Sequence, residues 1–166
     1  MEIPRVHYSV LVGFLEVLDD VGGKSDVAGI ASKQGLDLDY LLPILESGEM
    51  LGLIQVQGGD VLITEKGRLF TVASPKVTKK ILRDILINMD IFKKLVNFIK
   101  QSENGHITKD DVLKFISSNK NNDKPDTDSD SLKEFDWIIE WGRQALILNY
   151  NANTESLSLR QQRKFL

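Results

Sequence analysis

Apolar residues recur at steps of three and four along the first part of this chain, and that spacing predicts helices. The predicted helices run from about residue 6 to 19, from 25 to 33 and from 37 to 51. Gly35 is expected to turn the chain between the last two, because glycine tolerates the left-handed backbone of such turns. Leu53–Gln57 and Val61–Thr64 then flank a Gly-Gly-Asp turn, which predicts a β-hairpin.

The remaining residues predict a second set of helices and strands. A long helix is expected from 76 to 101, and a capping box at Thr108-x-x-Asp111 predicts another to about 118. Ser131-x-x-Glu134 predicts the cap of a helix that reaches about 144. Residues 117–130 consist of Ser, Thr, Asn, Asp, Lys and Pro, so we expect a flexible loop there. Leu146–Tyr150 and Leu157–Leu159 predict a closing hairpin.

Both halves therefore show helices followed by a hairpin, in the order of a winged helix-turn-helix. We predict a mainly α fold with small β-hairpins, a tandem winged helix-turn-helix. Residues 1–74 form the first unit, and 75–166 form the second with its bracing helix 76–101. Gly52-Leu53-Ile54 before the first hairpin is matched with Ala145-Leu146-Ile147 before the second.

Several short motifs resemble one protein family over nearly the whole chain. They are Gly13-Phe14-Leu15-Glu16-Val17-Leu18, Asp39-Tyr40-Leu41-Leu42-Pro43, Leu51-Gly52, Thr64-Glu65-Lys66-Gly67-Arg68-Leu69-Phe70 and Trp141-Gly142-Arg143. In combination they look like the AAA-associated C-terminal domain. That domain is attached to ATP-binding subunits of ABC importers of the nitrate, sulfonate and bicarbonate type.

The resemblance implies a cytoplasmic accessory or regulatory module whose partner is an ABC transporter ATP-binding subunit. It carries over no catalytic residue, because none belongs to this domain. No ATPase precedes the module in these 166 residues. We therefore expect either a stand-alone member of the family or one part of a larger protein. The sequence leaves open the transported solute and any ligand between the units. It also leaves open the oligomeric state, for which a homodimer is one possibility.

Composition adds few constraints to this picture. The net charge of −3 gives no global attraction to nucleic acid or anionic membrane. The absence of cysteine excludes disulfides and thiolate chemistry. No apolar run approaches the roughly 18 residues of a membrane span, and no secretory signal is visible. We expect a cytoplasmic protein without membrane insertion.

A winged helix invites a DNA-binding hypothesis, which the charge of the helix 37–51 argues against. No Lys or Arg occurs from Gln34 through Glu65. The residues expected to face DNA are Asp39, Leu42, Pro43 and Glu46, which cannot neutralise phosphate. We therefore predict that these four side chains contact a protein, with packing on the other half as the alternative. A DNA-binding transcription regulator remains the rival function; it would have to use other basic residues.

A second candidate contact surface is basic. It consists of four residues at helical spacing, Lys76, Lys79, Lys80 and Arg83. We interpret them either as the solvated face of the helix or as a docking site for an acidic partner or a phosphate-bearing ligand. Arg160, Arg163 and Lys164 form a weaker basic cluster, interpreted as a frayed tail. Arg143 is expected to pair with an acidic group or to hold a phosphate.

The sequence predicts neither enzymatic chemistry nor a cofactor. Gly22-Gly23-Lys24-Ser25 lacks the first glycine of a phosphate-binding loop, and Asp126-x-Asp128-x-Asp130 lacks the glycine and the bidentate Glu of a calcium loop. His7 and His106 lie in different halves and build no metal pair. Trp137 and Trp141 share a helix face, and core packing is favoured over a ligand platform.

Overall fold

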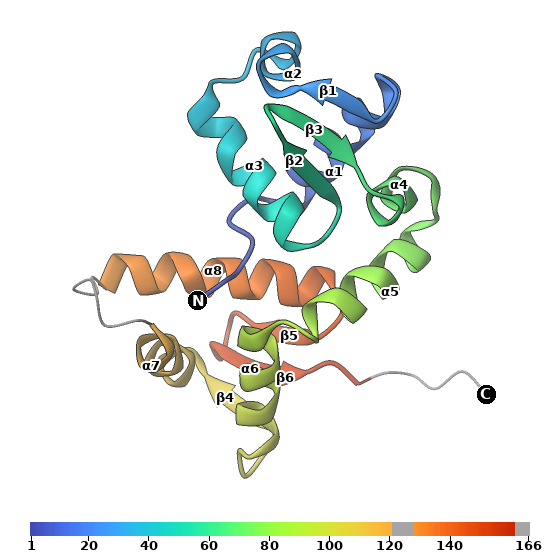
Figure 1. The fold of residues 1–166 in the computed structure, drawn as a ribbon. Helices are drawn as coiled ribbons and strands as arrows, with labels where there is room; N and C mark the ends of the chain where they lie inside the picture. Colours follow the sequence, from blue (N-terminus) through green and yellow to red (C-terminus); the bar gives the residue numbers. More distant parts are fainter. Residues whose placement is uncertain (121–127, 162–166) are drawn as a thin grey trace. The chain divides into compact units, whose positions relative to one another are not determined.

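Helices make up most of the chain, and two small antiparallel sheets complete it (Figure 1). The computed structural model describes residues 1–120 and 128–161. One compact unit is Ile3–Thr78, and the other consists of Met1–Glu2 and Lys79–Leu166. The division lies inside a helix, α5 (Pro75–Leu86), whereas the sequence placed it between residues 74 and 75.

The first unit begins with a helix and ends with a short capped helix. Its elements are α1 (Tyr8–Asp20), β1 (Lys24–Asp26), α2 (Val27–Gln34), α3 (Leu38–Met50), β2 (Ile54–Gln57), β3 (Asp60–Ile63) and α4 (Glu65–Val72), followed by the start of α5. Leu11, Phe14, Leu15 and Leu18 form the buried face of α1. Because α1 contacts α3, α4 and β3, this face is the centre of the core of the unit.

Local side chains and one glycine fix the ends of the short helices. The Asp26 carboxylate accepts a hydrogen bond from the Gly29 amide at 3.0 Å, which caps α2. Gly35 ends α2 in the left-handed conformation with φ 61°. The Thr64 hydroxyl accepts from the Gly67 amide at 3.0 Å and caps α4 in the same way.

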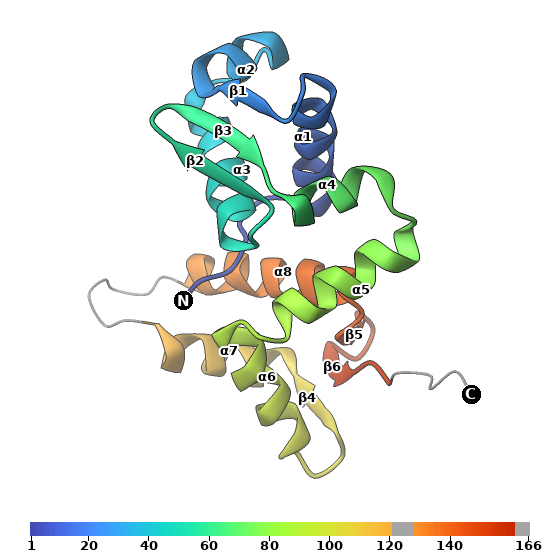
Figure 2. The same cartoon turned by 45° about the vertical axis from the view of Figure 1, so that its right-hand side comes forward.

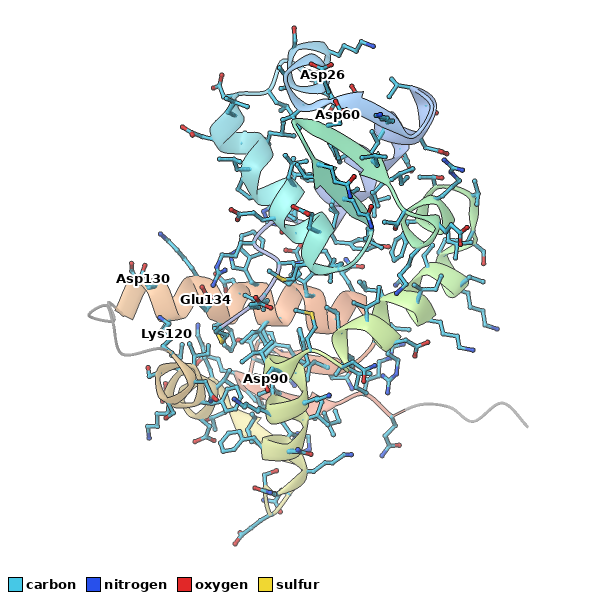
Figure 3. The ribbon with its side chains drawn as sticks, viewed as in Figure 1. Asp26, Asp60, Asp90, Lys120, Asp130 and Glu134 are labelled. Carbon is cyan, nitrogen blue, oxygen red and sulfur yellow. The ribbon has the colours of Figure 1, made fainter. Side chains whose placement is uncertain are left out.

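The hairpin prediction is confirmed, but the sheet contains a strand that the sequence did not reveal. The strand order is β1-β3-β2, with both pairs antiparallel. β1 has only three residues, too few to show an alternating pattern. Asp26 and Asp60 are register partners and lie side by side in Figure 3. Lys24 lies 3.7 Å from the Asp60 carboxylate and offsets this like-charge pairing.

The second unit has the same order of elements after α5. They are α6 (Asp90–Lys100), β4 (His106–Thr108), α7 (Lys109–Asn119), α8 (Asp128–Gln144), β5 (Leu148–Asn151) and β6 (Ser156–Leu159), with strand order β4-β6-β5. α7 and β5 each contact α8 (Figure 2). The rings of Phe98 and Phe115 stack 5.5 Å apart and join α6 to α7.

The predicted long helix 76–101 is wrong, because α5 and α6 are separate helices. The Asn88 side-chain amide donates to the Asp84 carbonyl at 2.7 Å. In a continuing helix the Asn88 backbone amide would donate to that carbonyl instead, so the side chain replaces the backbone donor. Met89 then adopts an extended backbone and precedes α6. The apolar spacing persists across the break, so periodicity alone could not reveal it.

The predicted flexible loop 117–130 is also wrong at both ends. Residues 117–119 belong to α7 and 128–130 to α8, whereas 121–127 lie outside the described residues. Ser131 is therefore not a cap but a buried residue within α8, with Lys120 Nζ 3.4 Å from its hydroxyl. Asp130 lies in the first turn of α8, where a carboxylate favours helix formation (Figure 3).

Equivalent turns precede and close the hairpin in both units. Gly52 and Leu146 both have positive φ, of 72° and 58°, at the turn that leads into the hairpin. The backbone geometry therefore matches Gly52 with Leu146, whereas the sequence matched Gly52 with Ala145, one residue earlier. Gly59 and Glu155 likewise both have positive φ, and the carbonyl of each accepts from the first residue of the preceding capped helix at 2.8 Å. The repeat therefore extends to backbone geometry.

Two motif glycines have opposite surroundings, which predicts opposite effects of a methyl group. A Cβ at Gly67 would collide with the Leu53 carbonyl oxygen, whereas one at Gly13 would meet nothing within 4 Å. We expect Gly67→Ala to lower the free energy of unfolding by roughly 1–3 kcal/mol. Gly13→Ala should raise it by up to about 1 kcal/mol, because alanine favours the helix. Urea unfolding of both variants measures the difference; a neutral Gly67→Ala would contradict the packing.

The capping box of α7 predicts a pH-dependent contribution to stability. Hydrogen bonds from the Thr108 amide and hydroxyl hold the pKa of Asp111 below its ordinary value. The charged form is therefore favoured in the folded state, and its contribution is present above about pH 4 and lost as the pH falls through the folded pKa. Asp111→Asn should cost roughly 1 kcal/mol at pH 7. In urea unfolding from pH 7 to pH 3, the difference from the parent chain should shrink; a constant difference would contradict the assignment.

Candidate functional site

The outward face of α3 carries the four residues proposed from the sequence on this helix. Asp39, Leu42, Pro43 and Glu46 recur at helical spacing and so lie on one side. Pro43 is half-buried and the other three are exposed. The opposite side is buried and consists of Leu41, Ile44, Leu45, Ser47 and Gly48. The structure therefore brings the four residues together on one solvent-facing patch, here called the α3 surface.

Two large apolar side chains that sequence reasoning did not select extend this part of the helix. Leu38 is 59% exposed and Tyr40 60% exposed, compared with 50% for Leu42. Leu38 lies one turn before Leu42 and thus beside the α3 surface. Both added residues belong to the first turn after Asp37, where the sequence shows two large apolar side chains outside the buried stripe. Neighbouring exposed apolar side chains are typical of a contact site.

Pro43 gives the α3 surface an uncommon backbone feature. It lies inside the helix and has no amide hydrogen, so the Asp39 carbonyl cannot accept the usual i+4 hydrogen bond. Proline in a helix interior is unfavourable by about 3 kcal/mol relative to alanine. Pro43 thus removes one backbone hydrogen bond from α3.

The electrostatics of the α3 surface are unfavourable for nucleic acid. Asp39 and Glu46 lie on it, Glu49 lies one turn further along, and no cation occurs from Gln34 through Glu65. The Glu49 carboxylate accepts from the Val56 amide at 3.4 Å and stays beside the hairpin. DNA binding needs Lys or Arg to replace counterions on phosphate, and this surface would repel phosphate instead.

The basic stripe proposed for residues 76–83 does not act as one solvated face. Lys76 and Lys80 are exposed, whereas Lys79 and Arg83 are half-buried. The Arg83 guanidinium donates to the Leu146 carbonyl at 2.8 Å and so stabilises the turn before β5. Lys76 belongs to the first unit and the other three to the second. Their role in binding a partner stays a prediction.

The aromatic and basic residues singled out on α8 have different surroundings. Trp141 is fully buried, which agrees with the preference for core packing, and Trp137 is half-buried. Arg143 is exposed in the last turn of the helix. Arg160 is exposed after β6, whereas Arg163 and Lys164 lie outside the described residues.

Neither a group of metal ligands nor a membrane-spanning helix occurs in the described part of the chain. Within residues 1–120 and 128–161, no three His, Cys, Asp or Glu side chains are grouped so that they could hold a metal ion. His7 and His106 are both exposed. None of the helices in these two ranges has the length and apolar character to cross a membrane.

Comparison with known proteins identifies the family. The model of the C-terminal AAA-associated domain matches residues 29–151, which extend from α2 to the end of β5. The chain belongs to this family, as its sequence motifs predicted. Searches of the curated proteins and of the solved structures found no match. The family name associates the chain with AAA-type ATPases, and the match includes the α3 surface.

Replacing the internal proline of α3 tests whether it is retained at a cost in stability. Pro43→Ala supplies the missing amide hydrogen for the Asp39 carbonyl, so the free energy of unfolding should rise by roughly 1–3 kcal/mol. Urea unfolding measures the change, with Glu46→Ala on the same face as a control expected to change it by less than about 0.5 kcal/mol. A less stable Pro43→Ala variant would mean that packing of the proline ring outweighs the lost hydrogen bond.

Proposed function

We propose that this chain is a non-enzymatic accessory module that regulates an ABC-type importer ATPase through direct protein contact. The observation that carries the proposal is the α3 surface, where an exposed leucine and a proline lie among carboxylates. Membership of the AAA-associated family supports an ATPase as the partner. ATP-binding subunits of importers act in the cytoplasm, which we propose as the location of this chain.

The proposed architecture is a pair of winged helices. Each unit has the order helix, strand, helix, helix and hairpin, and the first strand pairs with the last. In this arrangement α3 and α8 occupy the position of the helix that enters the major groove in DNA-binding relatives of the fold. In the first unit that helix presents the α3 surface, so we infer that it binds polypeptide.

The proposed mechanism is docking that shifts the conformational equilibrium of the ATPase. A module that binds one state of the ATPase more tightly raises the population of that state by the ratio of the two affinities. The leucine would contribute buried apolar area, and the carboxylates would select a partner surface that carries Lys or Arg. Regulation through such contact requires no catalytic residue in this chain.

A DNA-binding regulator is the alternative function, favoured only by the fold order. It would use the basic stripe, where Lys76 and Lys80 are exposed, the C-terminal tail, where Arg160 is exposed, or a surface created by a dimer. Binding of this kind weakens steeply with salt, because each phosphate contact releases a counterion.

Substituting Leu42 tests the proposed contact. Burial of a leucine contributes about 1.5–3 kcal/mol, so Leu42→Asp should weaken binding to the ATP-binding subunit of an importer from the same organism at least tenfold. Val72→Asp is the matched control, since Val72 is 71% exposed on α4, outside the α3 surface. Surface plasmon resonance with the purified subunit measures both, and circular dichroism checks that each variant is folded.

The outcomes separate the two functions. Unchanged affinity of Leu42→Asp would show that the α3 surface does not bind the ATPase. A gel shift of duplex DNA that disappears as salt increases would favour the DNA-binding alternative. Concentration-dependent mass in sedimentation that is lost in Leu42→Asp would identify the α3 surface as a homodimer contact and contradict the proposed docking.

A further inference from the structure

A pocket of about 680 Å³ lies within the second unit. Its walls come from α5, the start of α7, α8, β5 and the residue after β6, so it belongs to one unit and needs no contribution from the first. The volume falls in the range of small-molecule sites, roughly 300–1,000 Å³. The proposed ATPase contact does not involve this pocket, although the family match over residues 29–151 covers all of its lining residues except Arg160.

Four cationic side chains from different elements line the pocket. They are Lys79, Lys109, Arg143 and Arg160, while the lining contains only two carboxylates, Asp136 and Glu140. None of the four cations forms an ion pair with a carboxylate of the residues that the structure describes, whereas Lys24, Arg68 and Lys94 each do. In a chain of net charge −3, this concentration of positive charge is notable. Mutual repulsion of the cations would be relieved by a bound anion.

Three of these cations are connected to the turn at Leu146. Arg143 accepts the backbone hydrogen bond of Leu146 at 3.1 Å, and the Arg160 amide donates to the Ile147 carbonyl at 2.8 Å. Lys79 lies one helical turn before Arg83, whose guanidinium binds the Leu146 carbonyl. The turn thus holds the backbones of Arg143 and Arg160 near each other, and these two residues and Lys79 all line the same pocket. Guanidinium groups form paired hydrogen bonds with phosphate, and a lysine adds a point charge.

A second part of the pocket, here called its aromatic end, is lined by Phe135 and Tyr150. Phe135 precedes Arg143 by eight residues on α8, which corresponds to about 12 Å along the helix. The rings of Phe135 and Tyr150 meet edge to face with centroids 5.7 Å apart. Lys109 Nζ lies 5.1 Å from the centroid of the Phe135 ring. Tyr150 is half-buried, so part of its surface is available to a flat ring.

We propose that this pocket binds a nucleoside di- or triphosphate. Its phosphates would contact Lys79, Arg143 and Arg160, and its base would lie against the aromatic end. The exposed Asp136 carboxylate can accept hydrogen bonds from the amino group of a base or from a ribose hydroxyl.

Titration calorimetry of the purified full chain tests the proposal without any ATPase present. ADP and the four common nucleoside triphosphates are the probes, and inorganic triphosphate and adenosine represent the separate parts of the ligand. We expect at least one nucleotide to bind at least tenfold more tightly than either part. Lys79→Gln, Arg143→Gln and Arg160→Gln should each weaken that binding about tenfold or more. Tyr150→Leu should weaken nucleotide binding but leave binding of inorganic triphosphate unchanged.

Lys93→Gln is the matched control for Lys79→Gln. Lys93 is an exposed lysine of α6 in the same unit and does not line the pocket. Its loss changes the net charge equally and should leave affinity within about twofold. No binding of any nucleotide at millimolar concentration would overturn the proposal. So would equal affinity for inorganic triphosphate, or equal losses in Lys93→Gln and Lys79→Gln in variants whose circular dichroism shows that they are folded.

Discussion

In each unit the hairpin is positioned by a glycine of the helix that precedes it. Gly48 faces Ile54 so closely that a Cβ would come within 2.7 Å of its side chain, and Gly142 faces Leu148 more closely still. The residue before the strand donates its amide to the carbonyl of that same glycine at 2.9 Å in both units. The hairpin therefore packs directly against the backbone of the helix at this glycine. A larger side chain at the glycine position would prevent this close approach. The remaining strand and the capped helix are placed by pairing with this hairpin.

Much of this fold was predictable because its determinants are local. The capping box at Thr108 and Asp111 and the turn at Gly35 were predicted because these residue types are strongly preferred at helix ends. The errors concern features without a local residue signature. β1 and β4 are too short for periodicity, and the break after α5 depends on one side chain, Asn88, which replaces a backbone donor. Ser131-x-x-Glu134 resembles a capping box in sequence. In the structure α8 already begins at Asp128, so Ser131 lies inside the helix, where it is buried.

The candidate sites differ in the same way. A single helix determines the α3 surface, so helical spacing was sufficient to group Asp39, Leu42, Pro43 and Glu46. The pocket of the second unit could not be predicted, because Lys79 and Arg160 are 81 residues apart in the numbering. Only the folded chain around the turn at Leu146 makes both of them line the same pocket. Sequence reasoning left Arg143 either as the partner of an acidic group or as a phosphate ligand, and it had no means of finding the residues around it.

The equivalent turns of the two units carry opposite charges at one matched position. The residue that follows the close-packed glycine is Glu49 in the first unit and Arg143 in the second. The backbone turn is therefore the same in both units, whereas the exposed charge beside it is reversed. The same local fold thus presents an anion in the first unit and a cation in the second, so the two units favour ligands of opposite charge.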